Sequence, residues 1–289
     1  MGQTATTSIE TVVDLDRYPL LEPGSDSYTA AVSRAREELA ERGCMVLPGF
    51  VRGDLLDGLR LECASVAPLA YYDVEVVNVY NTATDSSLPP RHPVNATMER
   101  GNAFVARDQI PAHLLISRLY TCPEFQSFVA SCFELPAVFE LADPLSGLCL
   151  NVLTEGRSHP WHFDTNDFAI SMLTQAPLGG GSFEYCPDIR SAEAENFDDV
   201  GRVLAGEGDH LVHRLQLRPG DLQLFRGRYA LHRVTAVQGA RERHSAIFAY
   251  SGRPGVVGTM PRTKQLFGRV LPEHLTAARG AGRSDQLLD

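Results

Sequence analysis

Apolar positions in the first half of the chain recur with the spacing of helices that cover a core. Between residues 28 and 41 they return every three or four positions, which predicts an amphipathic helix. The apolar run Cys44–Leu47 predicts a strand, and residues 55–66 predict a second helix with Asp54 as its cap. Two more helices are predicted over residues 112–120 and 124–132, and the polar residues 1–27 predict a loosely attached lead-in.

Near residue 147 the pattern changes to short apolar runs separated by Gly, Pro and Asp. Short strands with frequent turn signals are typical of an antiparallel sandwich or barrel, so we expect a mainly β, jelly-roll fold with helical support. An acidic, partly helical insertion is predicted over residues 188–210. We expect a single domain over residues 28–289, with helical support and a lid (28–146), a β core (147–253) and a tail (254–289). The predicted strands cover residues 148–154, 167–174, 181–186, 211–217, 221–226, 231–237 and 243–251.

A proline-containing loop lies between the two halves. Residues 73–80 alternate valine and tyrosine with polar residues and predict a strand. The loop at 81–98 follows and contains Pro89, Pro90 and Pro93. Because loops of this length in compact domains are usually lids or disordered segments, we expect a lid over the active site.

The composition is that of an ordinary globular protein with a negative charge. Of the 289 residues, 44% are hydrophobic, and 26 Lys and Arg against 36 Asp and Glu give a net charge of −10. That charge argues against nucleic acid and anionic membranes as partners, and no apolar run is long enough to span a membrane. The start of the chain lacks the layout of a secretory signal, and the six cysteines form no Cys-x-x-Cys pair. We therefore expect a cytoplasmic protein with reduced thiols.

Three residues in the β-rich half suggest a metal site. His162 and Asp164 are two positions apart, so an extended backbone presents both side chains on one face. His232 follows the strand-like run at 221–225. Two imidazoles and one carboxylate form the facial triad that holds one face of Fe(II) and leaves the other open to oxygen and organic ligands. A turn with a hydrogen-bonded histidine would explain His162 and Asp164 alone, but their combination with His232 favours the metal.

An arginine on the last predicted strand adds a candidate anion site. An iron ion that binds a 2-oxo acid needs a cation for the distant carboxylate, which a guanidinium with a neighbouring hydroxyl supplies. Arg243 and Ser245 alternate onto one face and are the first choice, with Arg241 on the same side as the reserve. Asn151 could also point toward the 2-oxo acid, although hydrogen bonding within the core explains it equally well. Weaker candidates for contacts to a zwitterionic substrate are Glu184, Arg107 and Asp108.

Over residues 147–253 this pattern resembles the iron(II)/2-oxoglutarate-dependent oxygenases. These enzymes share a double-stranded β-helix core with His-x-Asp after its second strand and a His and Arg-x-Ser pair on the last two. The resemblance implies that the catalytic residues His162, Asp164 and His232 bind Fe(II), and that Arg243 and Ser245 bind the co-substrate 2-oxoglutarate. The spacing of 11 residues from His232 to Arg243 exceeds that of many members by about two, and Arg241 stands at the shorter spacing.

The resemblance also implies an activity. A dioxygenase of this family consumes O₂, converts 2-oxoglutarate to succinate and CO₂, and hydroxylates a C–H bond of its substrate. The stretches 161–185 and 231–235 look like a narrower branch that acts on free amino acids or similar small molecules in specialised metabolism. Related halogenases replace the carboxylate ligand with a small residue, so Asp164 favours hydroxylation over chlorination.

Other functions remain open at this point. The same iron chemistry could end in cyclisation or desaturation, or could act on a protein side chain. A catalytically silent barrel that binds a small carboxylate is the alternative outside enzymes, and the complete triad argues against it. The sequence leaves the substrate, the position of oxidation and the oligomeric state undetermined.

Overall fold

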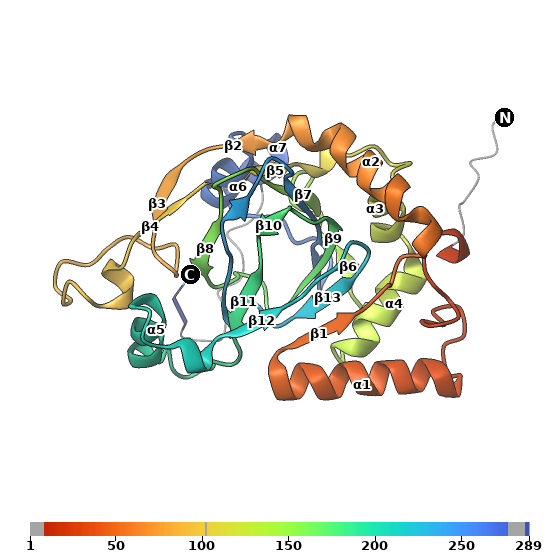
Figure 1. Cartoon of the computed structure of the whole chain (residues 1–289), viewed down its shortest axis with the longest axis horizontal. Coiled ribbons are helices and arrows are strands. Elements are labelled where there is room, and N and C mark those ends of the chain that lie inside the picture. The colour runs from red at the N-terminus through yellow and green to blue at the C-terminus, as the bar shows by residue number, and fades with distance from the viewer. Residues whose placement is uncertain (1–8, 102, 277–286, 289) are drawn as a thin grey trace.

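Two antiparallel sheets form the centre of the molecule, and the helices of the N-terminal half lie along one side of it (Figure 1). The structure, a computed structural model, describes residues 9–101, 103–276 and 287–288. The major sheet has the strand order β1-β13-β9-β16-β7-β5-β2, and the minor sheet has the order β12-β11-β14-β8. This mainly β jelly roll with helical support confirms the predicted fold class.

The element bounds agree with most of the predicted elements. The helices are α1 (Asp26–Arg42), α2 (Leu56–Val66), α3 (Leu115–Tyr120), α4 (Pro123–Cys132), α5 (Phe197–Leu204), α6 (Met260–Phe267) and α7 (Pro272–Thr276). The strands of the major sheet are β1 (Cys44–Leu47), β2 (Tyr71–Tyr72), β5 (Ala103–Val105), β7 (Leu148–Leu153), β9 (Ala169–Gln175), β13 (Leu222–Phe225) and β16 (Arg243–Phe248). The minor sheet contains β8 (His159–His162), β11 (Phe183–Cys186), β12 (His213–Leu215) and β14 (Leu231–Val234). Short strand pairs are formed by β3 (Glu75–Val77), β4 (Met98–Arg100), β6 (Phe139–Glu140), β10 (Gly179–Gly180), β15 (Val237–Gln238) and β17 (Tyr250–Ser251).

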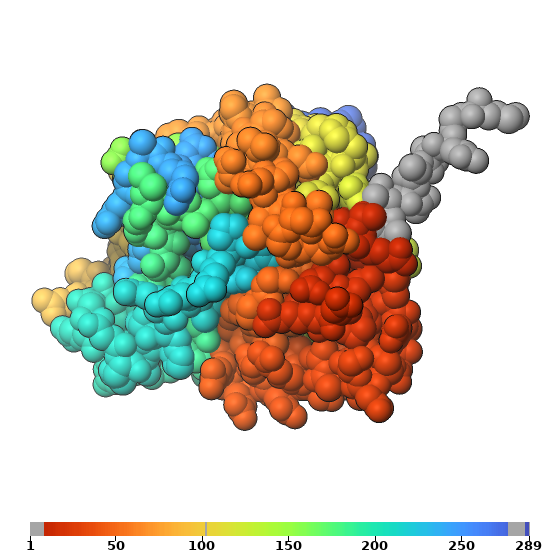
Figure 2. Space-filling model, turned by 45° about the vertical axis from the view of Figure 1, so that its right-hand side comes forward, coloured from red at the N-terminus to blue at the C-terminus, as the bar shows by residue number. Residues whose placement is uncertain are grey.

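The two faces of the major sheet have different roles. On β16, Ala246 and Phe248 lie in the main hydrophobic core, where the ring of Phe248 contacts Phe125 of α4 at 5.7 Å. Arg243 and Ser245 alternate with them and therefore face the inside of the barrel. Alternate side chains of β16 therefore serve different roles: one set packs in the hydrophobic core, and the other set can line a site inside the barrel. In Figure 2 the N-terminal helices form one side of the molecule and the α5 insertion stands on the other.

Helix α1 shows how the sequence sets an element of this support. The Ser25 hydroxyl accepts a hydrogen bond from the Tyr28 N–H at 3.1 Å and caps the start of the helix. Gly43 ends it in the left-handed conformation, with φ of 64°. The buried side chains between these caps are Tyr28, Val32, Ala35 and Leu39. Their spacing of three and four residues places them on the one face that packs against the core.

The predicted lead-in is wrong for residues 9–27. Val13 is buried and forms a β-bridge with Val51, and the Tyr18 hydroxyl donates to the Pro48 carbonyl at 2.8 Å. These apolar side chains belong to the main core, so their burial holds the segment against the barrel. The polar residues between them made this burial hard to predict from the sequence. Residues 1–8 lie outside the described part of the chain.

The predicted cap of the second helix is also wrong. Helix α2 starts at Leu56 after a 3₁₀ turn at Gly53–Leu55, and no side chain caps it. The Asp54 carboxylate pairs instead with Arg52 at 2.9 Å. The strand predicted over residues 73–80 is shorter and comprises Glu75–Val77.

The loop predicted as a lid is fixed at several points. At its start, the Gln265 amide of α6 donates to the side-chain oxygen of Asn81 at 3.0 Å. Further along, the His92 ring contacts Phe197 of α5 at 4.4 Å, and Val94 is buried in a second hydrophobic core. The loop therefore joins the α5 insertion to α6. Its role as a lid stays a prediction.

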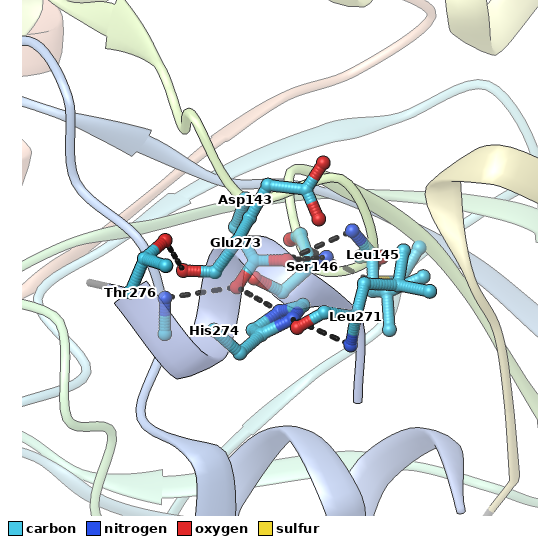
Figure 3. Close-up of polar contacts among 9 residues, drawn as sticks. Asp143, Leu145, Ser146, Leu271, Glu273, His274 and Thr276 are labelled. Atoms are coloured by element: carbon cyan, nitrogen blue, oxygen red, sulfur yellow. Dashed lines mark hydrogen bonds and ion pairs between the residues drawn. The ribbon is translucent and has the colours of Figure 1, made fainter. Parts of the chain in front are cut away.

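One buried carboxylate holds both ends of α6 against the barrel. Asp143 Oδ1 accepts from the Leu145 and Ser146 N–H groups at 2.8 and 2.9 Å (Figure 3). Asp143 Oδ2 accepts from the Gly258 N–H at 2.8 Å and lies 3.2 Å from His274 Nε2. Because Gly258 precedes α6 and His274 belongs to α7, Asp143 fixes the helix between them. The tail expected over residues 254–289 contains α6 and α7, and its residues 277–286 and 289 lie outside the described part of the chain.

The described cysteines agree with the expectation of reduced thiols. All six are free, and only Cys122 is partly exposed. Among the described helices, none combines the length and apolar character that a membrane crossing requires.

Candidate metal centre

Two paired strands bring the candidate histidines together. Strands β8 and β14 are antiparallel neighbours, and His162 is the register partner of His232. Opposite residues of such a pair project to the same side, and their rings lie 4.0 Å apart between centroids. Asp164 follows the end of β8, where its N–H donates to the Gly227 carbonyl at 3.1 Å. The minor sheet and this turn therefore assemble all three residues.

The ligand atoms converge on one point. Asp164 Oδ1 lies 3.5 Å from His232 Nε2 and 3.8 Å from His162 Nε2. The ligand atoms of the three residues all lie within 4.8 Å of one another. Metal–ligand bonds of about 2 Å place neighbouring ligand atoms about 3 Å apart, so a small contraction of this set accommodates a divalent ion.

Backbone carbonyls orient both imidazole rings. His162 Nδ1 donates to the Pro160 carbonyl at 2.8 Å, and His232 Nδ1 donates to the Ala230 carbonyl at 2.9 Å. A proton on each Nδ1 leaves the Nε2 lone pair directed at the carboxylate. Outer hydrogen bonds of this kind fix the tautomer of metal-binding histidines.

The protonation states also fit a metal. Burial lowers the pKa of His162 well below its usual value, and the neighbouring His159 and His232 lower it further. For Asp164, burial raises the pKa, but the interactions with His232 and then with His162 outweigh that effect and bring the pKa to about 2. At neutral pH the site therefore offers a neutral imidazole and a carboxylate, which are the forms that bind metal.

Gly227 makes room for the carboxylate. A Cβ atom at this position would lie 1.8 Å from Asp164 Oδ2 and 2.6 Å from its Cγ. Only glycine therefore permits the observed placement of Asp164. The sequence carries no signal for this role, because the contact joins residues 63 positions apart.

Arg243 is the buried cation expected on the last long strand. Its Nε donates to the Gly181 carbonyl at 2.9 Å and its Nη1 donates to Ser245 Oγ at 2.7 Å. Burial lowers its pKa to about 10, and no carboxylate of the described residues forms an ion pair with it. Arg241 is exposed and donates to the Pro177 carbonyl at 3.3 Å. The geometry therefore favours Arg243 over Arg241 as an anion partner inside the barrel.

Asn151 lies beside this arginine on the same face of the sheet. It is the register partner of Ser245, and it is 3% exposed. Its amide donates to the Ala103 carbonyl at 3.1 Å, which is the hydrogen bond within the core that the sequence left open. This bond uses one donor of the amide.

A second cluster near the triad was missed in the sequence. The His159 ring stacks on His162 at 3.9 Å, and its pKa is well below the usual value because of burial and then of the Arg100 charge. Arg100 of β4 is 6% exposed and lies 3.8 Å from the Glu75 carboxylate. Arg262 of α6 is half-buried; burial lowers its pKa, whereas the charges of Asp164 and Glu75 raise it. Two arginines and a glutamate thus surround one side of the metal site.

The weaker candidates lie elsewhere. The Glu184 carboxylate is buried and binds Arg214 and Arg233 on the minor sheet. Arg107 donates to the Ile110 carbonyl at 3.1 Å and to the Ser117 hydroxyl, and Asp108 pairs with Arg269. These partners account for the three residues without a substrate.

Aromatic rings pack around the metal-ligand residues. The Phe163 ring stacks on Tyr80 at 5.6 Å with an interplanar angle of 20°. The Trp161 ring lies under the Arg233 guanidinium at 4.5 Å. Phe225 contacts His232 from the major sheet at 4.8 Å between ring centroids. Aromatic rings from both sheets therefore pack close to the residues of the triad.

The jelly-roll fold and the cluster of His162, Asp164 and His232 agree with the resemblance to the iron(II)/2-oxoglutarate-dependent oxygenases, and these three residues could hold the iron ion. Residues 28–260 match the sequence model of HalD, Halogenase D, and the chain belongs to this family. No curated protein matches the chain.

Solved structures are similar to this chain at low sequence identity. The non-haem α-ketoglutarate-dependent epimerase SnoN from nogalamycin biosynthesis is 14% identical with a TM-score of 0.50, over 77% of this chain and 83% of that one. AviO1 from Streptomyces viridochromogenes Tue57 is 13% identical with a TM-score of 0.50, over 76% and 94%. An oxidoreductase of the 2OG-Fe(II) oxygenase family from Burkholderia pseudomallei is 17% identical with a TM-score of 0.47, over 81% and 94%.

Proposed function

We propose that this enzyme hydroxylates a C–H bond of a small, amino-acid-like molecule while 2-oxoglutarate is converted to succinate and CO₂. The observation that carries the proposal is the convergence of His162, Asp164 and His232 on one point. The same barrel encloses the Arg243 guanidinium, with which no carboxylate of the described residues forms an ion pair. One oxygen atom of O₂ enters the substrate and the other enters succinate, which balances the reaction.

Each residue has a defined part in this proposal. His162, Asp164 and His232 hold one face of the iron, which supplies oxygen activation when it is bound. Arg243 and the Ser245 hydroxyl bind the distant carboxylate of 2-oxoglutarate, because a buried guanidinium gains most from an anion that replaces its lost hydration. Phe225 packs against His232 and excludes water from that side.

The charges beside the triad support an amino-acid-like substrate. Arg100 and Arg262 can bind a carboxylate, and Glu75 can bind an ammonium group. The charges of both Asp164 and Glu75 raise the pKa of Arg262, so its guanidinium lies within electrostatic reach of both carboxylates. A zwitterion matches this set better than an uncharged molecule does.

Asp164 supports hydroxylation within a family named for halogenation. Its carboxylate could supply the third protein ligand. The carboxylate also occupies the space that a side chain at position 227 would need. A halide bound at that ligand position would require the carboxylate to be absent. We therefore propose that oxygen transfer is the outcome for this chain.

The test is succinate formation by anaerobically iron-loaded protein that is then exposed to air with a panel of free amino acids. We expect one or a few amino acids to raise turnover strongly, and His162→Ala and Arg243→Ala to abolish it. Turnover that no amino acid stimulates would contradict the substrate class. Absence of iron binding would contradict the whole proposal.

A matched pair of variants on α6 tests the substrate contacts. Arg262→Gln removes the cation beside the triad, whereas Lys264→Gln removes an exposed cation of the same helix. We expect Arg262→Gln to raise KM for the amino acid about tenfold or more, from the loss of a charged hydrogen bond, with KM for 2-oxoglutarate unchanged. Lys264→Gln should change neither. An equal effect of both variants would refute the role of Arg262.

A further inference from the structure

A buried arginine lies directly behind the metal-ligand loop. The Arg190 side chain is fully buried, and its guanidinium carbon lies 3.8 Å from the centroid of the Phe163 ring. Phe163 stands between the ligands His162 and Asp164, and its other neighbour is the stacked ring of Tyr80. The ring of Phe163 therefore takes its position from Arg190 and Tyr80 together.

The same guanidinium connects three further segments. Arg190 Nε donates to the Arg228 carbonyl at 2.7 Å, and Arg190 Nη1 donates to Glu195 Oε2 at 3.0 Å. Arg190 Nη1 also donates to the Leu288 carbonyl at 3.1 Å. The Arg228 carbonyl lies one residue after Gly227, whose own carbonyl accepts the Asp164 N–H. Arg190 thus holds both the ring inside the ligand loop and the turn that receives its aspartate.

The segment at residues 287 and 288 supplies one of the hydrogen-bond partners of this arginine. The Leu288 N–H donates to Glu195 Oε1, so the carboxylate that pairs with Arg190 also binds this segment. Leu287 is 9% exposed, and Leu288 packs against the second hydrophobic core, which contains Phe163. A buried charge is costly unless its partners are complete, so release of the segment leaves the guanidinium with fewer of them.

We propose that Arg190 is a positioning residue for the metal ligands and that docking of residues 287–288 is energetically coupled to metal binding. The inference rests on the proposed metal site. If Arg190 shifts, the Phe163 ring loses its cation–π contact, and we expect the flanking residues His162 and Asp164 to move with it. Outer residues that orient metal ligands typically contribute 10- to 100-fold to metal affinity. The coupling is reciprocal, so bound metal should in turn hold the segment in place.

The test compares metal binding by four variants of the full chain. Co(II) is titrated anaerobically, and its dissociation constant, its visible absorption spectrum and the thermal unfolding of each protein are recorded. Arg190→Met keeps an unbranched stem without the charge, and Arg190→Lys keeps the charge without the planar stack. Leu287→Asp releases the segment without altering any residue around the metal. Arg107→Met is the matched control, because Arg107 also bonds a carbonyl and lies over a tyrosine ring, in the helical support.

We expect Arg190→Met to weaken Co(II) binding about 10- to 100-fold and to change the spectrum, because the ligand geometry changes. Leu287→Asp should weaken binding in the same direction by about 5-fold. Arg190→Lys should fall between Arg190→Met and the unaltered protein. Arg107→Met should lower the unfolding temperature without changing either metal readout.

Two results would overturn the inference. The first is that Arg190→Lys and Leu287→Asp both bind Co(II) with unchanged affinity and an unchanged spectrum. These two variants test the inference even if Arg190→Met does not fold. The second is an equal loss of binding in Arg107→Met, which would show a general effect of stability. Failure of the unaltered protein to bind Co(II) would overturn the metal site together with this inference. Binding that no variant changes would overturn the inference alone.

Discussion

Gly227 has no side chain, and the space that one would fill is occupied by the Asp164 carboxylate. Gly227→Ala places a methyl group 1.8 Å from Asp164 Oδ2, so the carboxylate must leave its position. We expect metal affinity to fall about tenfold or more, in the range seen when a ligand's support is lost. Gly58→Ala is the control, because a Cβ there meets nothing within 4 Å and alanine favours the surrounding helix α2. Metal titration of both variants checks this, and equal affinities would contradict it.

Arg243 and Arg241 are two residues apart and differ in burial. Arg243→Gln removes a buried cation, and truncating one partner of a buried charged pair typically costs about 2–5 kcal/mol. We therefore expect KM for 2-oxoglutarate to rise about 30-fold or more in Arg243→Gln. Arg241→Gln should leave KM for 2-oxoglutarate within about twofold, because Arg241 is exposed. Steady-state succinate assays at varied 2-oxoglutarate measure both, and the reverse ranking would assign the clamp to Arg241.

Among single residues, the sequence predicts those that lie only two positions apart in the chain. The His-x-Asp pair and the Arg-x-Ser pair each lie on one strand or turn, so alternation alone places them together. Arg100, Arg190 and Arg262 could not be found in this way. Each reaches the site from a different element, and an isolated arginine is usually a surface residue. Their roles depend on tertiary packing that no local pattern records.

The carboxylate that anchors α6 gives a pH dependence at the scale of elements. Burial raises the pKa of Asp143, but hydrogen bonds from three backbone N–H groups outweigh burial and lower it below the ordinary 3.8. A lowered pKa in the folded state stabilises the protein above the pKa of the unfolded chain, and this contribution is lost as the pH falls through the folded-state value. Asp143→Asn replaces the charged carboxylate that accepts these hydrogen bonds with a neutral amide.

We expect Asp143→Asn to reduce the free energy of unfolding by about 1.5–3 kcal/mol at neutral pH, the usual range for hydrogen bonds to a charged group. The difference between the two proteins should shrink as the pH falls below 3.8, because the unfolded chain binds a proton at Asp143 more readily than the native carboxylate does. Urea unfolding from pH 7 down to pH 3 measures it. A difference that stays constant over this range would contradict the account.

Most helices and strands were predicted where apolar residues recur with a regular helical or strand period. Elements without such a regular period were missed. Strand β8 was not predicted, although it carries His162. It is four residues long, contains Pro160, and the register of its pairing with β14 shifts between His232 and Val234. An irregular pairing has no strict alternation, so the period-two signal is absent. The buried segment at residues 9–27 was missed because its apolar residues follow neither period.

At the scale of the whole molecule, the metal should stabilise the fold. Its proposed ligands join strand β8, strand β14 and the turn at Gly227, so a bound ion links segments that separate on unfolding. At a free metal concentration of 100 times Kd the expected gain is about 2.7 kcal/mol. Differential scanning fluorimetry should show a rise of several degrees in Tm, and His162→Ala should remove the rise. A rise retained in His162→Ala would place the bound metal elsewhere.

The fold class could be predicted as a whole because turn signals divide the second half into short strands. The sequence also predicted hydroxylation rather than chlorination from Asp164, and this stays a prediction, because membership of a halogenase family points to the other outcome. The structure supports oxygen transfer, because the carboxylate has the hydrogen bonds, the histidine neighbours and the space at Gly227 that a third ligand needs.

The most direct measurement is the fate of labelled oxygen. The iron-loaded enzyme is supplied with ¹⁸O₂, 2-oxoglutarate and its amino-acid substrate in a buffer that contains chloride, and the products are analysed by mass spectrometry. The account predicts one ¹⁸O atom in succinate and one in the hydroxylated substrate, although exchange with water can dilute the second. A chlorinated product formed by the unaltered enzyme, or substrate oxidation without succinate, would contradict it.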